Sequence, residues 1–205
     1  LGACKKTDHP VMLRIEGGGE TGDCAWHKSA RFGKRIRRRC QQAAAIVTPS
    51  QATYDEALGA GFKSDTLHHI PNGVAVSIDS VVGKTTIRQR LREINHDLSG
   101  DPDTKIALFT GRLTHNKGLF ELVSAWQSVA ERIPNSQLWL VGEGPDRDRL
   151  SEKIRDLDLV GRVVMPGTFD DVEDFLAAAD VFTLPSYTEG LSLSLLEAMA
   201  HRLPV

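Results

Sequence analysis

The sequence lacks long hydrophobic runs, a signal peptide and a strong excess of either charge. Its longest apolar runs are far shorter than the roughly 20 residues that a membrane-spanning helix needs. No N-terminal stretch has the pattern of a secretory signal. The formal net charge is -2, whereas proteins dedicated to binding nucleic acid are usually basic. These absences predict a cytoplasmic globular protein that does not bind nucleic acid.

Cysteine is also scarce. The three cysteines, Cys4, Cys24 and Cys40, lie far apart and form no Cys-x-x-Cys pair. A disulfide framework normally has a dense and even set of cysteines, so we expect reduced thiols. Because the spacing also fits no common zinc-binding pattern, we predict no metal site.

The remaining composition is that of a globular protein, with 40% hydrophobic and 25% charged residues over 205 positions. From residue 105 onward, short apolar runs alternate with amphipathic stretches. The expected strands cover residues 105–111, 137–142, 162–167 and 180–186, and the helices that follow them cover residues 118–133, 146–157, 171–179 and 191–200. Such alternation is typical of a parallel sheet covered on both faces. We therefore predict an α/β, doubly wound, Rossmann-like domain.

The first 74 residues show a looser version of the same alternation. The expected strands cover residues 10–17 and 44–50, the expected helices cover 25–43 and 51–62, and an extended segment at 66–74 ends in a Pro-Asn-Gly turn. Residues 75–104 contain no run typical of a buried strand and one short polar helix candidate at 85–94.

These patterns predict three parts. Residues 1–74 are the C-terminal part of a first Rossmann-like domain, residues 75–104 are the interdomain connection, and residues 105–205 are an incomplete second domain. Because the chain starts at Leu1 and ends where Pro204 and Val205 begin another expected strand, we expect both domains to be truncated in a fragment of a longer protein.

Two cations follow the first strand of the second domain. Arg112 and Lys117 lie in the stretch "TGRLTHNKG" (110–118). Ligands of open parallel sheets bind outside the carboxyl ends of the strands, and the flanking Gly111 and Gly118 let backbone approach a ligand closely. Two solvated surface charges are the plain alternative. Their position at a strand end favours a clamp for a phosphate group.

The closing stretch, "YTEGLSLSLLEAMAHRLPV", places Glu189 and Glu197 around an expected helix start near Leu191. The free N–H groups of Leu191, Ser192 and Leu193 would then form an anion site. The rise of a helix separates the two carboxylates by about 10–12 Å, close to the separation of sugar and ribose in a nucleotide-sugar. Glu197 lies in a nearly apolar run and needs a partner. The alternative is that Glu189 only favours the helix dipole and that Glu197 is a surface residue.

Four motifs carry a family resemblance. The motifs "GRLTHNKG", "LWLVGEGP", "ADVFTLPS" and "EGLSLSLLEAMAHRLPV" together resemble the C-terminal donor domain of the family-4 retaining glycosyltransferases, which have the GT-B fold. The spacing of Glu189 and Glu197 matches the E-x7-E signature of that family, and "IPNGV" (70–74) resembles its interdomain connection. The resemblance covers about residues 44–205.

The resemblance implies a hexosyltransferase-type enzyme that moves a sugar, with retention, from a nucleotide-diphosphate donor to a hydroxyl acceptor of a polysaccharide, lipid or small molecule. The donor would be UDP-, GDP- or ADP-linked, with no covalently bound cofactor and no required metal. Residues 1–74 would then be the acceptor side, and 105–205 the donor-binding domain.

The resemblance also assigns residues. Arg112 and Lys117 would bind the donor diphosphate and stabilise the leaving group, Glu189 would contact the donor sugar, and Glu197 the ribose. The implied catalytic residues are Arg112, Lys117 and Glu189, and the implied donor-binding residues are Gly111, Arg112, Lys117, Glu189, Gly190, Leu191, Ser192, Leu193 and Glu197. One departure is that the common E-G-F-G step reads Glu189-Gly190-Leu191-Ser192 here, which leaves the identity of the sugar open.

Two other kinds of function stay open. A GT-B fold epimerase would need no acceptor, and a phosphorylase would require pyridoxal phosphate or inorganic phosphate. A non-catalytic sugar-nucleotide binding module would bind nucleotide without turnover. The complete set of Arg112, Lys117 and the paired glutamates favours the transferase.

A basic helix is expected around residues 31–39, with cations at Lys34, Arg35, Arg37, Arg38 and Arg39. The helix is either a solvated face or a surface for anionic lipid or a charged acceptor. The second alternative would place the protein peripherally at the inner face of the membrane.

Overall fold

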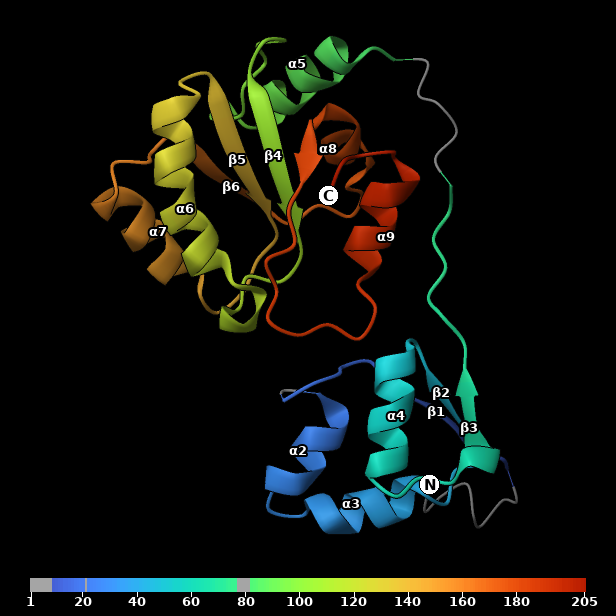
Figure 1. Cartoon of the computed structure of the whole chain (residues 1–205). Coiled ribbons are helices and arrows are strands. Elements are labelled where there is room, and N and C mark those ends of the chain that lie inside the picture. The colour runs from blue at the N-terminus through green and yellow to red at the C-terminus, as the bar shows by residue number, and fades with distance from the viewer. Residues whose placement is uncertain (1–8, 21, 77–81) are drawn as a thin grey trace. The chain divides into compact units, whose positions relative to one another are not determined.

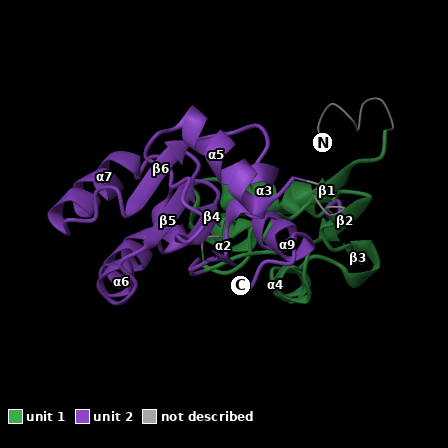
Figure 2. Cartoon of the chain, turned by 90° about the horizontal axis from the view of Figure 1, so that it is seen from above, with its two compact units in different colours: residues 1–73, 188–192 green, residues 74–187, 193–205 purple. Residues whose placement is uncertain are grey.

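The computed structural model describes residues 9–20, 22–76 and 82–205. Contacts between Cα atoms divide the chain into two compact units, which are coloured separately in Figure 2. Unit 1 consists of Leu1–Gly73 and Thr188–Ser192, and unit 2 consists of Val74–Tyr187 and Leu193–Val205. Each unit has its own parallel sheet.

Unit 1 is built on a three-stranded parallel sheet with the order β1-β2-β3 (Figure 1). Its elements are β1 (Met12–Arg14), α2 (Asp23–Ser29), α3 (Gly33–Cys40), β2 (Ala45–Thr48), α4 (Gln51–Gly59), the 3-10 helix η1 (Ser64–Thr66) and β3 (Leu67–His69). The core combines Ile46 from the sheet with Cys24 from α2 and Ala57 from α4. Ser50 caps α4, since its side-chain oxygen accepts a hydrogen bond from the amide of Thr53.

The single helix predicted over residues 25–43 is wrong, because the chain forms α2 and α3 there with a break between them. Ala30 has extended backbone, with φ −71° and ψ 143°, and ends α2. At Gly33 the first turn of α3 passes so close to α2 that a Cβ would lie 2.1 Å from the carbonyl oxygen of His27. This close crossing depends on packing between two helices, which the helical periodicity of the sequence does not record.

Unit 2 contains a four-stranded parallel sheet with the order β6-β5-β4-β7. Its strands are β4 (Lys105–Thr110), β5 (Ser136–Val141), β6 (Val163–Gly167) and β7 (Val181–Phe182), and its helices are α5 (Lys84–Ile94), η2 (His115–Lys117), α6 (Leu119–Arg132), α7 (Arg147–Asp156), α8 (Glu173–Ala178) and α9 (Leu193–Ala200). The chain proceeds outward from β4 to β6 and then returns to the other side of β4. This is the strand order of a Rossmann-like half, and it confirms the predicted α/β fold with parallel sheets.

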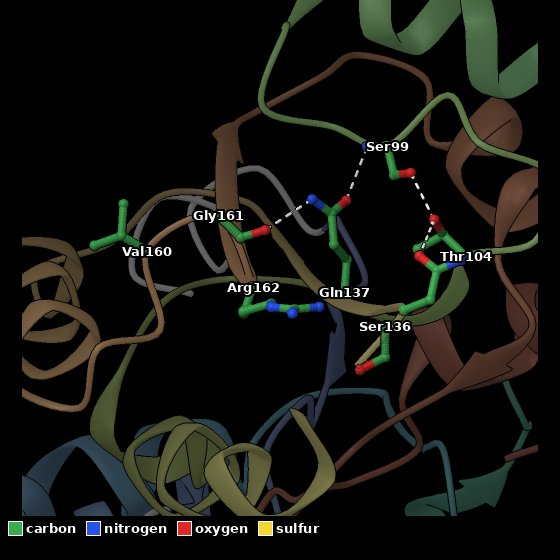
Figure 3. Close-up of a pocket in the computed structure, with 8 residues that line it drawn as sticks. Ser99, Thr104, Ser136, Gln137, Val160, Gly161 and Arg162 are labelled. Carbon is green, nitrogen blue, oxygen red and sulfur yellow. Dashed lines mark hydrogen bonds between the residues drawn. The ribbon is translucent and has the colours of Figure 1, made fainter. Parts of the chain in front are cut away.

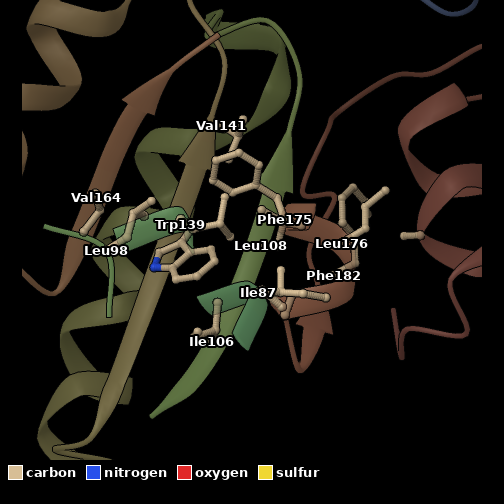
Figure 4. Close-up of a cluster of buried hydrophobic side chains, with 14 residues drawn as sticks. Ile87, Leu98, Ile106, Leu108, Trp139, Val141, Val164, Phe175, Leu176 and Phe182 are labelled. Carbon is tan, nitrogen blue, oxygen red and sulfur yellow. The ribbon is translucent and has the colours of Figure 1, made fainter. Parts of the chain in front are cut away.

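Both faces of the sheet in unit 2 are buried. Ile106 and Leu108 of β4 point into one core, which α5, α8 and α9 cover, and their neighbours Ala107 and Phe109 point into the other, which α6 and α7 cover. Figure 4 shows the first core, where the Trp139 ring meets the edge of Phe175 at a centroid distance of 6.0 Å. Burial on two faces explains why these strands are continuous apolar runs.

Helix α5 belongs to unit 2, although its stretch of sequence is polar. It lies within residues 75–104, the predicted connection, of which residues 77–81 are outside the described residues. Ile87 and Leu91 enter the first core. Between them, Arg88 is only 1% exposed. The helix therefore contributes both apolar and charged groups to the packing of the sheet.

Candidate functional site

The strand order of unit 2 reverses between β4 and β7, and the carboxyl ends of these two strands are where such folds bind ligands. Glycines bring the loops together at this edge. Gly142 has φ +143°, and a Cβ there would lie 1.9 Å from the carbonyl oxygen of Gly111. Gly118 has φ +65°, and its Cβ would lie 2.2 Å from the carbonyl oxygen of Pro185. Only glycine fits at these two positions, because positive φ and backbone contact coincide.

The loop after β4 is further tied to the loop after β7. The amide of Tyr187 donates a hydrogen bond to the carbonyl of Asn116 at 3.0 Å. The ring of His115 lies 6.1 Å, centroid to centroid, from the rings of both Tyr187 and Phe120. The loop that carries Arg112 and Lys117 is therefore held in place against the strand that reverses the sheet order.

Arg112 follows Gly111 directly and is exposed. The ion pairs found among the described residues do not include it. Lys117 is half-buried and is the last residue of η2, not the first residue of α6 as predicted. The left-handed Gly118 separates the two helices. The two cations therefore flank a short loop with a 3-10 turn at this edge.

Helix α9 begins at Leu193 and not near Leu191. Of the three amides predicted to form its free N-terminus, only that of Leu193 lies within the helix. The predicted donor residues divide between the two units: Gly111, Arg112, Lys117, Leu193 and Glu197 lie in unit 2, and Glu189, Gly190, Leu191 and Ser192 lie in the segment that clusters with unit 1. The structure thus gathers half of the predicted set at one sheet edge.

Within unit 1, the segment Thr188–Ser192 approaches the loops that follow β1 and β3. Asn72 donates a side-chain hydrogen bond to the carbonyl of Leu191 at 2.7 Å. A Cβ at Gly190 would lie 2.4 Å from the carbonyl oxygen of Glu16. Close backbone contact therefore requires glycine at position 190, and Asn72 of the Pro-Asn-Gly turn is a contact residue that the sequence reasoning missed.

Glu197 is half-buried on α9 among apolar neighbours. Burial raises the pKa of its carboxyl above the ordinary value, and the nearby charge of His201 acts in the opposite direction. No described residue forms an ion pair with it. A partly desolvated carboxylate without a cation is suited to accept hydrogen bonds from hydroxyl groups of a ligand.

Two hydroxyls at this edge were also missed. Thr110, the last residue of β4, is 5% exposed, and within the described part of the chain its Oγ1 has no hydrogen-bond partner. The Oγ of Ser186, in the loop after β7, is likewise buried without one. A hydroxyl at the end of an apolar strand run was the available signal. Buried polar atoms without partners are rare and indicate a place where another group binds.

The opposite, amino edge of the same sheet contains a polar hollow of about 290 Å³ (Figure 3). Its side chains bond to one another. Gln137 accepts hydrogen bonds from the Ser99 amide and the Trp139 indole, and donates to the carbonyls of Asp97 and Gly161. These hydrogen bonds use both ends of the Gln137 amide and join four segments of the chain. The hollow is thus part of the packing of the sheet.

A buried ion pair closes the amino edge beside this hollow. Arg88 binds Asp180 at 2.9 Å and donates to the carbonyls of Ala178, Asp101, Pro102 and Thr104. Lys84 binds the other oxygen of Asp180 at 2.7 Å. Burial acts to raise the pKa of Asp180, but the hydrogen bonds from Lys84 and the Ile106 amide and the two positive charges together lower it.

The fold and the carboxyl edge define a Rossmann-like nucleotide-binding domain, and the similarity to known proteins gives its class. Residues 104–205 match the family model of glycosyl transferases group 1. This half of the chain is a group 1 glycosyltransferase domain.

Curated relatives extend the likeness towards the N-terminus. The chain is 33% identical, over 87% of its length, to the putative teichuronic acid biosynthesis glycosyltransferase TuaC of Bacillus subtilis, of which it covers 42%. It is 39% identical, over 50% of its length, to the lipopolysaccharide core biosynthesis glycosyltransferase LpsE of Rhizobium meliloti, of which it covers 29%. The chain thus spans less than half the length of these relatives.

Solved structures agree on the fold. HepE of Anabaena, in complex with UDP and glucose, aligns with a TM-score of 0.80 at 21% identity, over 99% of this chain and 54% of HepE. TarM of S. aureus aligns with a TM-score of 0.72 at 18% identity, over 96% of this chain and 36% of TarM. The chain therefore has the α/β fold of GT-B-like glycosyltransferases.

Proposed function

We propose that the protein is a metal-independent, retaining glycosyltransferase that transfers a sugar from a nucleotide-diphosphate donor to a hydroxyl acceptor. The observation that carries the proposal is the position of Arg112. It is an exposed cation outside the ion pairs of the described residues, placed after β4 where the strand order reverses in a group 1 glycosyltransferase domain.

The proposed chemistry follows from charge. When the bond between the sugar and the diphosphate breaks, negative charge develops on the departing phosphate oxygen. Arg112 and Lys117 flank a loop at this edge and would stabilise that charge in the transition state. Their loop is fixed by Gly118 and by the hydrogen bond between Tyr187 and Asn116, so little reorganisation is needed when the charge forms.

The remaining donor contacts are assigned by the family resemblance. Glu197, whose carboxyl has a raised pKa and no ion pair with a described residue, would accept hydrogen bonds from the ribose. Glu189 would contact the donor sugar, next to Gly190. The amide of Leu193 at the start of α9 would add a hydrogen-bond donor for the diphosphate.

We also propose a cytoplasmic location with peripheral contact at the inner face of the membrane, through the basic segment 31–39. Among the residues that the structure describes, no helix is long and apolar enough to span a bilayer. The positive charge of this segment supports an attraction to anionic lipids.

The first test is calorimetric titration of UDP, GDP and ADP into the full-length protein. UDP is the leading ligand, because HepE is described with UDP. We expect one nucleotide to bind, and Arg112→Ala to weaken that binding while Arg90→Ala, which changes an exposed cation on α5, leaves it unchanged. If the folded protein bound no nucleotide, the donor site would be rejected.

The second test is turnover. Arg112→Ala and Lys117→Ala should each lower kcat about a hundredfold or more, the size of effect seen when one electrostatic catalyst is lost. Lys105→Ala, at the opposite end of β4, is the matched control for Lys117→Ala. Tight nucleotide binding with no turnover of any sugar donor would instead support a non-catalytic module.

A further inference from the structure

Unit 1 carries a concentration of positive charge that the near-neutral total hides. From residue 24 to residue 54 the sequence contains seven lysines and arginines and neither aspartate nor glutamate. The chain as a whole has a formal net charge of -2. This charge lies on α2, on α3 and on the link between them, so it forms a local surface of one sign.

The cations of α3 share one side of the helix. Lys34, Arg35, Arg38 and Arg39 are exposed, and at 3.6 residues per turn they fall within an arc of about 140°. Cys40 lies outside this arc and packs against the core of unit 1. The four exposed cations make no ion pair with any residue in the described ranges.

Two large aromatic side chains are exposed on the same pair of helices. Trp26 of α2 is 51% exposed, and Phe32, just before α3, is 59% exposed. The guanidinium of Arg31 lies over the Phe32 ring, 5.4 Å from its centroid. Helices α2 and α3 are consecutive and cross closely at Gly33 (Figure 1). The break that the sequence pattern missed is therefore what exposes Phe32 beside the cations.

We propose that α2 and α3 form a docking surface for a membrane that contains anionic lipids. The cations on α3 contact lipid phosphates and carboxylates, and Trp26 and Phe32 insert at the level of the headgroups. Charge complementarity selects an anionic surface. The aromatic pair selects a membrane over a soluble polyanion, because a polyanion offers no apolar layer in which to bury the rings.

The test uses the full chain with vesicles of phosphatidylcholine, with and without phosphatidylserine. The protein should sediment with the vesicles that contain phosphatidylserine, and less so as salt is added, since salt screens the attraction. Trp26 reports insertion, because the other two tryptophans, Trp126 and Trp139, are 7% and 0% exposed. Its fluorescence should shift to shorter wavelength on binding, and Trp26→Phe should lose the shift but keep the binding.

Paired variants separate this surface from general charge. Arg35→Gln together with Arg38→Gln should weaken vesicle binding about thirtyfold, since each cation near an anionic membrane contributes about fivefold. Arg90→Gln together with Arg92→Gln removes two exposed cations from α5 of unit 2 and should change binding less than twofold. Phe32→Ser should weaken binding severalfold, whereas Ile94→Ser, at an exposed apolar residue of α5, should not.

Three outcomes would overturn the proposal. The first is no binding of the folded wild-type protein to anionic vesicles. The second is an equal loss of binding in the α3 and α5 double variants. The third is binding of dextran sulfate, lost in the Arg35 and Arg38 variant, without any vesicle-induced shift of Trp26 fluorescence, which would make the surface a site for a soluble polyanion.

Discussion

The two ends of β4 place a buried threonine in opposite situations. Thr104, just before the strand, is 3% exposed, and its hydroxyl donates to the side chain of Asn135 and hydrogen-bonds Ser99, both at 2.8 Å. Thr110, the last residue of the strand, is 5% exposed, and its hydroxyl has no partner among the described residues. The amino edge therefore satisfies its polar groups internally, and the carboxyl edge leaves a polar group available to a ligand.

Two carboxylates of unit 2 repeat the contrast. Asp180 at the amino edge is held by Lys84 and Arg88, and its pKa is lowered. Glu197 has no ion pair within the described residues, and burial raises its pKa. Both are partly buried, so the difference comes from their partners. A site that leaves polar groups unsatisfied lowers the stability of the free protein and favours the bound state.

The largest expected effect is at the amino edge. Arg88→Met should lower the free energy of unfolding by about 3–5 kcal/mol, because the buried carboxylate and the carbonyls that Arg88 binds lose their partner. Urea unfolding measures this loss, with Arg90→Met on the exposed side of α5 as the control. A loss below about 1 kcal/mol would mean that the Arg88 network is not what closes this edge.

Thr104→Val should destabilise the protein by about 1–3 kcal/mol. The substitution keeps the shape of the side chain but leaves the Asn135 and Ser99 groups without their hydrogen-bond partner. The same urea titration measures it, and an unchanged midpoint would contradict the closed network drawn in Figure 3.

Thr110→Val, the same change at the other end of the strand, should stabilise the ligand-free protein by about 1 kcal/mol. It removes a buried hydroxyl that has no partner within the described ranges and leaves no other group unsatisfied. Thermal unfolding without nucleotide is the measurement. If the two threonine variants shifted the Tm in the same direction, the contrast between the edges would be lost.

The smallest effect is expected for Glu197→Gln and depends on pH. A raised pKa means that the folded state binds the proton more tightly than the unfolded state, so stability falls as pH rises from the unfolded pKa through the folded pKa. Above that range the variant should be more stable than the wild type, by about half a kcal/mol. Below it, the two should unfold alike.

Thermal unfolding across acid to neutral pH tests this, with nucleotide titration alongside. The variant should bind nucleotide more weakly at neutral pH if Glu197 contacts the ribose. A variant that is less stable at neutral pH would show that the ionised carboxylate has a stabilising partner.

The fold of unit 2 could be predicted because its strands are buried on both faces. The expected strand at 137–142 is β5 within one residue at each end, and the helix at 118–133 is α6 within one residue. The break at Gly33 and the late start of α9 could not be predicted in the same way. They depend on contacts with distant backbone, such as the carbonyl of His27, and not on local periodicity.

The candidate site was predictable at the level of the sheet edge. Arg112 could be placed there because it directly follows an apolar strand, and its proposed role in catalysis stays a prediction. Arg88 could not be distinguished from its exposed neighbours Arg90 and Arg92 by residue type. Its burial depends on carbonyls of the loop before β4 and on Asp180, which are distant in sequence.

The strand order also bears on the order of folding. Ala107 of β4 pairs with Leu138 of β5, which is near in the sequence, and with Val181 of β7, which is far more distant. Closing a longer loop costs more chain entropy and slows the contact that depends on it. The crevice between β4 and β7 therefore needs the most non-local strand pairing of unit 2. We expect β4 to pair with β5 first, so that the ligand-binding edge is completed last as the chain folds.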